Sequence, residues 1–148
     1  MPSFHTTRRV RHAPEKMFDL VADVEQYPRF VPLCESLTVR LRRPLDNGAE
    51  VLVADMTVAY ALFRETFTSK VTLDRPHDTI VVEYLDGPFR HLENRWTFEP
   101  DGEGCHVGFW INYEFKSRAL GALMGAMFDK AFRRFSEAFE ERADAVYG

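Results

Sequence analysis

The chain has 148 residues, of which 45% are hydrophobic and 28% charged, as is typical of a soluble globular domain with a substantial core. Its formal net charge of −4 argues against broad, non-specific binding to DNA or other nucleic acids. Two cysteines, Cys34 and Cys105, are too few for a disulfide framework and fit no metal-ligand spacing, which favours a reducing compartment. We expect a single domain over residues 1–148 with no leader, because Ser3–Val10 already has the pattern of a strand.

The N-terminal part of the chain alternates between strand and helix patterns. A β-rich segment, Ser3–Arg11, is followed by Pro14, which suits a first helical turn, and by apolar residues at helical spacing through about Asp23. A second short helix is predicted for Glu25–Val31, and Pro32 ends it.

From Ser36 onward the apolar residues recur with a period of two, which predicts strands. Six strands are expected, at about residues 36–42, 49–63, 66–73, 79–85, 92–98 and 107–115. Residues 49–63 are interpreted as one long apolar strand or a strand that bends. Turn residues such as Asp46-Asn47-Gly48 separate several of the strands. Consecutive strands joined by tight turns predict an antiparallel meander.

Ser117–Tyr147 has the pattern of one long amphipathic helix of roughly 45 Å, with Ser117 as its N-cap. We expect Leu120, Leu123, Met124, Met127, Phe128, Phe132, Phe135 and Phe139 to be buried, with Val146 beside this face. So much apolar surface needs a cover. The fold class is therefore α+β: a curved antiparallel sheet of about seven strands around a long C-terminal helix, with two short helices after strand 1 and a cavity between sheet and helix. The uncharged segment Ala119–Phe128 either lies deeper in the protein or meets an apolar ligand or a membrane surface.

Four stretches resemble one known family. Tyr27–Cys34 (YPRFVPLC) is similar to its "YPxFLPWC" stretch, Phe67–Val71 to its "FTSxV" strand, Gly87–Phe98 to its "GPFxxLxxxWxF" segment, and Tyr113–Phe115 also fits. Taken in this order, they resemble the coenzyme Q-binding START-domain family of the helix-grip superfamily, which includes the START and pollen-allergen-like proteins and polyketide cyclases. Leu33 departs from the family pattern, which has Trp there.

This resemblance implies a non-enzymatic protein that binds ubiquinone or a related polyprenyl lipid and supports respiration. It also implies a cytoplasmic location with transient, peripheral association with the inner membrane. A bacterial branch of the same family consists of toxins that block ribosomal subunit association, so ribosome binding is the alternative. A small-molecule cyclase or hydrolase is the third interpretation.

We expect the ligand groove between the start of the long helix and the inward strand residues. The expected ligand-binding residues are Tyr27, Phe30, Leu33, Phe67, Phe89, Asn94, Trp96, Phe98, Tyr113, Leu120, Met124, Met127 and Phe128. Asn94 or Tyr113 is expected to offer a hydrogen bond to a quinone carbonyl. Tyr27–Cys34 either packs the short helices against the sheet or forms a lid, and Phe89 either packs at a turn or lies at the groove mouth.

The sequence predicts no catalytic residues, no metal site and no cofactor other than a bound quinone. The histidines, His5, His12, His77, His91 and His106, are scattered and show no ligand spacing. Ser69 and Cys34 have no recognisable base partner. Two arginine clusters, Arg8, Arg9 and Arg11 and then Arg40, Arg42 and Arg43, are interpreted as solvated strand faces, as sites for anionic lipid headgroups, or as contacts to ribosomal RNA.

Overall fold

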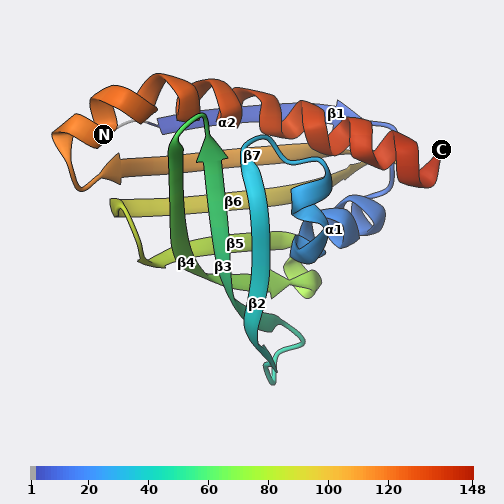
Figure 1. Cartoon of the computed structure of the whole chain (residues 1–148). Helices are drawn as coiled ribbons and strands as arrows, with labels where there is room; N and C mark the ends of the chain where they lie inside the picture. The colour runs from blue at the N-terminus through green and yellow to red at the C-terminus, as the bar shows by residue number, and fades with distance from the viewer. Residues whose placement is uncertain (1–2) are drawn as a thin grey trace.

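A computed structural model describes residues 3–148 (Figure 1). The order of its elements agrees with the prediction: a strand, two short helices, six strands and one long helix. The elements are β1 (Ser3–Val10), α1 (Pro14–Ala22), the 3₁₀ helix η1 (Val24–Arg29), β2 (Cys34–Pro44), β3 (Glu50–Tyr60), β4 (Phe63–Asp74), the 3₁₀ turn η2 (Arg75–His77), β5 (Thr79–Asp86), β6 (Phe89–Asp101), β7 (Gly104–Phe115) and α2 (Arg118–Tyr147).

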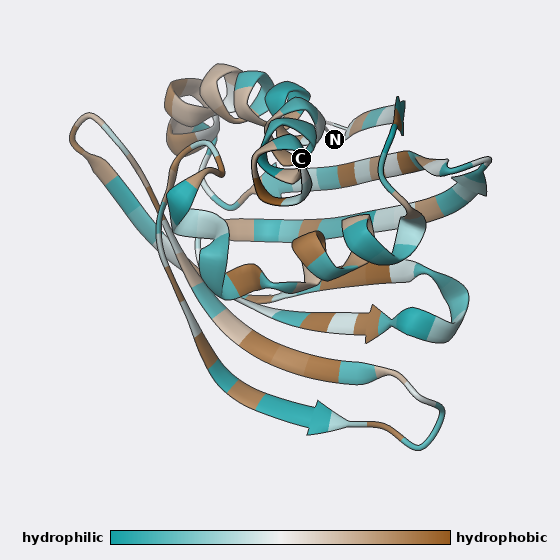
Figure 2. Cartoon of the chain, turned by 90° about the vertical axis from the view of Figure 1, so that its right-hand side faces the viewer, coloured by the Kyte–Doolittle hydropathy of each residue, from teal (hydrophilic) through white to brown (hydrophobic). Residues whose placement is uncertain are grey.

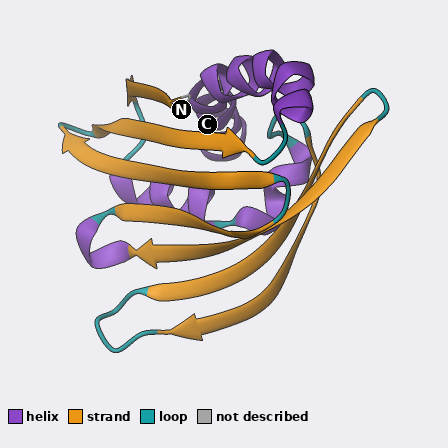
Figure 3. Ribbon diagram, turned by 90° about the vertical axis from the view of Figure 1, so that its left-hand side faces the viewer, coloured by secondary structure: helices purple, strands orange, loops and turns teal. Residues whose placement is uncertain are grey.

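All seven strands form one antiparallel sheet in the order β1-β7-β6-β5-β4-β3-β2. The sheet curves strongly, and α2 lies against its concave side (Figures 1 and 3). Register shifts accompany this curvature, for example between Thr68 and Ser69 where β4 meets β5. Such irregularities bend a strand and increase its twist. The α+β helix-grip fold expected from the sequence is confirmed.

The hairpin between β3 and β4 corrects one prediction. Residues 49–63 do not form one strand, because β3 ends at Tyr60 and β4 begins at Phe63. The turn is Ala61-Leu62, in which Ala61 adopts a left-handed φ of 53° and Leu62 is fully exposed. Neither residue is among those that commonly form turns, so the sequence does not indicate a turn at this place.

Hydrophobic and hydrophilic residues alternate along several strands (Figure 2). Because successive side chains of a strand point to opposite faces, this alternation gives the sheet one apolar face, and the side chains that line the space beneath α2 are almost all apolar. The helix α2 buries Met124, Phe128, Ala131, Phe132, Ser136, Phe139 and Ala143 against this face. The expectation that Leu123 is buried is wrong, since it is 61% exposed; Val146, expected beside this face, is 50% exposed. Both lie off the stripe that contacts the sheet.

The uncharged start of α2 is no more buried than the rest of the helix, so the interpretation that it lies deeper is wrong. Only Met124 and Phe128 are fully buried in this part, whereas Ala119, Ala122 and Leu123 are exposed. None of the helices within residues 3–148 combines the length and the apolar character needed to cross a bilayer.

The N-terminus of α2 is capped as predicted. The Ser117 Oγ accepts a hydrogen bond from the backbone N–H of Leu120 over 3.2 Å. Ser117→Ala is expected to lower the free energy of unfolding by about 1 kcal/mol, because it removes this acceptor. Urea denaturation measures the loss, and Ser117→Asp, which keeps an acceptor, serves as the control. Equal losses in both variants would contradict a capping role.

The C-terminus of α2 is held by charged groups that follow β1. Asp144 Oδ1 lies 2.7 Å from Nε2 of the buried His12 and 3.1 Å from Arg11. The Arg11 guanidinium also donates to the carbonyl of Gly148 over 2.8 Å. These contacts fix the helix end beside the loop between β1 and α1.

The Asp144 carboxylate is expected to stabilise the fold in a pH-dependent way. The hydrogen bond with His12, and secondarily Arg11, holds the pKa of Asp144 below its ordinary value of 3.8. The folded pKa is therefore the lower one, so the contribution is present above pH 3.8 and is lost as the pH falls through the folded value. The stability difference between wild type and Asp144→Asn should be present near neutral pH and shrink under acid. A difference that grows with acid would contradict this.

Candidate functional site

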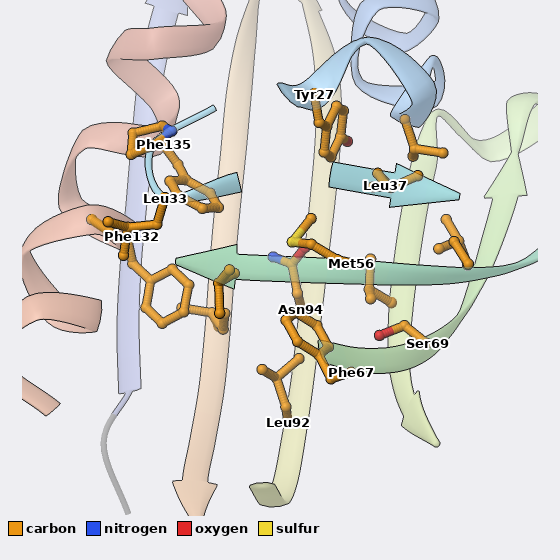
Figure 4. Close-up of a pocket in the computed structure, with 18 of the residues that line it drawn as sticks. Tyr27, Leu33, Leu37, Met56, Phe67, Ser69, Leu92, Asn94, Phe132 and Phe135 are labelled. Atoms are coloured by element: carbon orange, nitrogen blue, oxygen red, sulfur yellow. The ribbon is translucent and has the colours of Figure 1, made fainter. Parts of the chain in front are cut away.

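A cavity lies between the concave face of the sheet and the middle of α2 (Figure 4). Its volume is about 100 Å³, below the roughly 300–1,000 Å³ of clefts that hold drug-sized ligands, and it is partly open to solvent. The lining residues are Val24, Tyr27, Pro32, Leu33, Leu37, Ala54, Met56, Val58, Phe67, Ser69, Val71, Ile80, Val82, Phe89, Leu92, Asn94, Trp96, Ile111, Phe128, Ala131, Phe132, Phe135 and Phe139. Almost all of these side chains are apolar.

The periodicity of each element explains which residues reach the cavity. On β3 every second residue, Ala54, Met56 and Val58, points inward, as the pleat of a strand requires. On α2, Phe128, Phe132 and Phe135 recur at helical spacing and form the opposite wall.

The structure brings part of the predicted site together. Tyr27, Leu33, Phe67, Phe89, Asn94, Trp96 and Phe128 line the cavity. Phe30, Phe98, Tyr113, Leu120, Met124 and Met127 do not line it. Whether any of these residues contacts a ligand stays a prediction.

The residues that miss the cavity are packed elsewhere in the core. Phe98 makes ring contacts with Phe18 at 5.7 Å and with Trp96 at 6.4 Å. The Tyr113 ring packs 5.1 Å from that of Phe132, and Tyr113 does not line the cavity, contrary to the expectation. Phe30 packs 4.9 Å from Phe139.

The start of α2 misses the cavity because aromatic rings fill the space beneath it. Phe115 stacks on Phe89 at 4.8 Å and meets Phe128 at 5.4 Å. The open space therefore begins at Phe128 and extends toward Phe139. The prediction that Leu120, Met124 and Met127 line the groove is wrong for this reason.

Several lining residues were not predicted to bind the ligand, among them Leu37, Ala54, Met56, Val58, Ile80 and Val82 on β2, β3 and β5. Period-two alternation identifies the inward residues of β3, but only once the end of that strand at Tyr60 is known. Ser69 has no recognisable base partner in the sequence and is not expected to be a nucleophile. It lines the cavity instead, and its Oγ has no hydrogen-bond partner in the protein.

The loop between η1 and β2 borders the cavity. Leu33 has a left-handed φ of 67°, and its carbonyl accepts a hydrogen bond from Ala59 N–H over 3.0 Å, which ties the loop to β3. Tyr27 packs 5.3 Å from Phe139, and its hydroxyl donates to the carbonyl of Val21. The stretch Tyr27–Cys34 thus both packs against α2 and lines the cavity.

The titratable side chains near the cavity are held in their neutral forms. Burial, with smaller contributions from Cys34 and Asp23, raises the pKa of the Tyr27 phenol. Burial raises the pKa of the Cys34 thiol to about 11, so it is a poor nucleophile at neutral pH. Within residues 3–148 no three His, Cys, Asp or Glu side chains gather in a way that would hold a metal ion.

Apart from Arg11, which directly follows β1, the arginines of the two clusters lie on β1 and β2, the two edge strands of the sheet. Their ion pairs are Arg8–Glu140, Arg9–Asp101, Arg11–Asp144, Arg40–Asp55, Arg42–Glu25 and Arg42–Glu50. Charged edge strands discourage pairing with other chains. Carboxylates beside the guanidinium groups also weaken the positive field that RNA or anionic lipid would meet. These contacts support the interpretation as solvated strand faces.

A family model described as "Polyketide cyclase / dehydrase and lipid transport" matches residues 10–140. The chain belongs to this family. It is 30% identical to the "Ribosome association toxin RatA" of Rickettsia prowazekii over 99% of both chains. It is 33% identical to the "Coenzyme Q-binding protein COQ10 homolog B, mitochondrial" of Xenopus laevis, over 90% of this chain and 54% of that protein.

Among solved structures, a START superfamily protein from Mycobacterium smegmatis superposes with a TM-score of 0.79. The two chains are 18% identical, and the match covers 97% of this chain and 98% of the other, so this likeness bears on the fold. The resemblance inferred from the sequence motifs is confirmed, and the family includes both toxin and coenzyme Q-binding relatives.

Proposed function

We propose that the protein binds ubiquinone or a related polyprenyl quinone in the cavity and carries it without catalysing a reaction on it, in support of respiratory electron transport. The cavity beneath α2 is the observation that carries this proposal, because it offers an apolar space with an opening. A flat, uncharged quinone ring with an isoprenoid tail is chemically matched to such a lining. The coenzyme Q-binding relative supports the same ligand class.

A carrier rather than an enzyme is favoured by the chemistry of the lining. Its polar side-chain groups belong to Tyr27, Ser69, Asn94 and Trp96, none of which has a nearby acid or base positioned for proton transfer. A cyclase or hydrolase, the third interpretation, needs such groups in contact with its substrate.

Trp96 provides a direct test of quinone binding. The chain has two tryptophans, of which Trp96 lines the cavity and Trp110 does not. In a Trp110→Phe variant, a short-chain ubiquinone should quench the remaining fluorescence in a saturable way. Lipid extracted from protein purified from its native host should also contain quinone. Absence of both signals would contradict the proposal.

Loading and delivery of such a lipid require contact with a membrane, which we propose to be peripheral and transient, at the inner membrane on its cytoplasmic side. Leu62 at the β3–β4 turn and Leu123 on α2 are exposed apolar side chains suited to that contact. Flotation with liposomes tests it, and the double variant Leu62→Asp, Leu123→Asp should float less than wild type. Equal flotation of the two would contradict it.

Ribosome association is the second candidate, and the identity to the toxin relative along nearly all of both chains favours it. Co-sedimentation with ribosomal subunits at moderate salt, run in parallel with quinone titration, separates the two candidates. Ribosome association without quinone binding would replace the carrier proposal by the toxin one. Quinone binding without ribosome association would remove the second candidate.

A further inference from the structure

The few polar groups in the cavity differ in whether they already have partners. Tyr27 donates its hydroxyl to a backbone carbonyl. Trp96 Nε1 donates to Asn94 Oδ1 over 3.1 Å, and Asn94 Nδ2 donates to the carbonyl of Trp110 over 2.9 Å. Because an amide NH₂ has two hydrogens, one N–H of Asn94 stays available, and so does the hydroxyl of Ser69.

Ser69 is the unusual member of this group. Ser69 is only 6% exposed, yet its Oγ has no hydrogen-bond partner in the protein. Buried hydroxyls normally find partners, since leaving one unpaired costs free energy. Ser69 lines the cavity beside the register shift between β4 and β5, and such irregularities are common next to binding sites (Figure 4). A ligand oxygen or N–H is the partner that the protein does not supply.

Ser69 and Asn94 lie on either side of one strand. Ser69 on β4 pairs with Tyr84 of β5, and Asn94 on β6 pairs with Val82 of β5. Because β5 lies between β4 and β6, these two strands are about 10 Å apart. Val82 also lines the cavity, so a flat ring lying over Val82 has Ser69 on one side and Asn94 on the other.

The charge of the lining restricts the ligand further. Over the part of the chain that the structure describes, no Asp, Glu, Lys, Arg or His side chain lines the cavity. An ionised carboxylate or phosphate would lose its hydration there without gaining an opposite charge. Such a lining favours a ligand whose polar end is uncharged and can accept a hydrogen bond.

We infer that Ser69 and Asn94 form a head-group site, which selects ligands with an uncharged, oxygen-bearing ring over fatty acids and polyprenyl phosphates. This inference rests on the proposed function, because it places the ligand in the same cavity. Since the Ser69 hydroxyl has no partner in the protein, its removal weakens ligand binding and leaves the fold at least as stable.

The test uses the Trp110→Phe protein with two probes of similar tail length, decylubiquinone and dodecanoic acid, the acid being measured by competition. Ser69→Ala is expected to weaken decylubiquinone binding about 5- to 10-fold, the effect of losing one hydrogen bond. Ser69→Thr, which keeps the hydroxyl, should retain most of the affinity. At neutral pH the acid should bind at least tenfold more weakly than the quinone, because an unpaired carboxylate loses its hydration in the cavity. The midpoint of thermal unfolding of unliganded Ser69→Ala should be equal to or above that of the wild type.

The outcomes separate this inference from the proposed function. If Ser69→Ala binds the quinone as tightly as the parent protein, or if the acid binds as tightly as the quinone, the head-group site is overturned while binding in the cavity stands. If the parent protein binds neither probe, the proposed function fails and the inference falls with it.

Discussion

Replacing Phe89 by alanine is expected to lower the free energy of unfolding by about 3–5 kcal/mol. The Phe89 side chain is completely buried. Its ring lies between 4.8 and 6.3 Å from the rings of Phe67, Tyr84, Tyr113, Phe115 and Phe128. It therefore joins β4, β5, β7 and α2 beside the cavity, and its loss removes one of the aromatic contacts between the helix and the sheet. Urea denaturation followed by circular dichroism measures the change.

A matched control for Phe89→Ala is Leu62→Ala. Leu62 is also a large apolar residue, but it is fully exposed at the turn between β3 and β4. Its truncation is expected to change stability by less than about 0.5 kcal/mol, as for other surface substitutions. A loss below about 1 kcal/mol in Phe89→Ala would contradict its role, because truncation of a buried aromatic residue normally costs several times as much.

The order of elements was predictable because it follows from local signals. Changes of hydrophobic period mark the passage from helix to strand, and residues such as Gly48 and Gly87, both with positive φ, mark the turns. The hairpin at Ala61-Leu62 was missed for the opposite reason. Ala61 takes up a left-handed conformation that alanine seldom adopts, so the sequence there contains no turn signal.

The cavity was only partly predictable, since it depends on where the sheet stands away from the helix. Alternation on β6 identified Asn94 and Trp96, which do line it. Helical periodicity identified the apolar face of α2, but periodicity gives no position along the helix axis. The curvature of the sheet, with its register shifts such as that beside Ser69, places the open space beneath Phe132 and Phe135 rather than beneath Leu120.

The same reasoning explains why Leu123 is exposed. Periodicity in α2 counts every apolar residue near the stripe as buried, whereas a curved sheet covers only the residues that point directly at it. Leu123, in the uncharged start of the helix, is therefore an apolar side chain that no other part of the fold covers. This is the part of α2 that the membrane proposal uses, and it is distinct from the cavity wall.

Filling the cavity without disturbing the fold gives the most direct test of where the ligand binds. Ala54→Phe places a ring in the cavity from β3, opposite α2, and is expected to weaken quinone binding at least tenfold, about 1.4 kcal/mol, by occupying the ligand's space. Because the ring enters open space rather than a packed core, its effect on stability should stay below the 1–3 kcal/mol typical of overpacking. Quenching of Trp96 fluorescence measures the binding.

Ala59→Phe is the control on the same strand, since Ala59 does not line the cavity. It introduces the same ring on the other face of β3 and should leave quinone affinity unchanged. If Ala54→Phe folds and binds the quinone as tightly as Ala59→Phe, the quinone binds outside the cavity. The unpaired hydroxyl of Ser69 would then need another explanation, because no ligand would reach it.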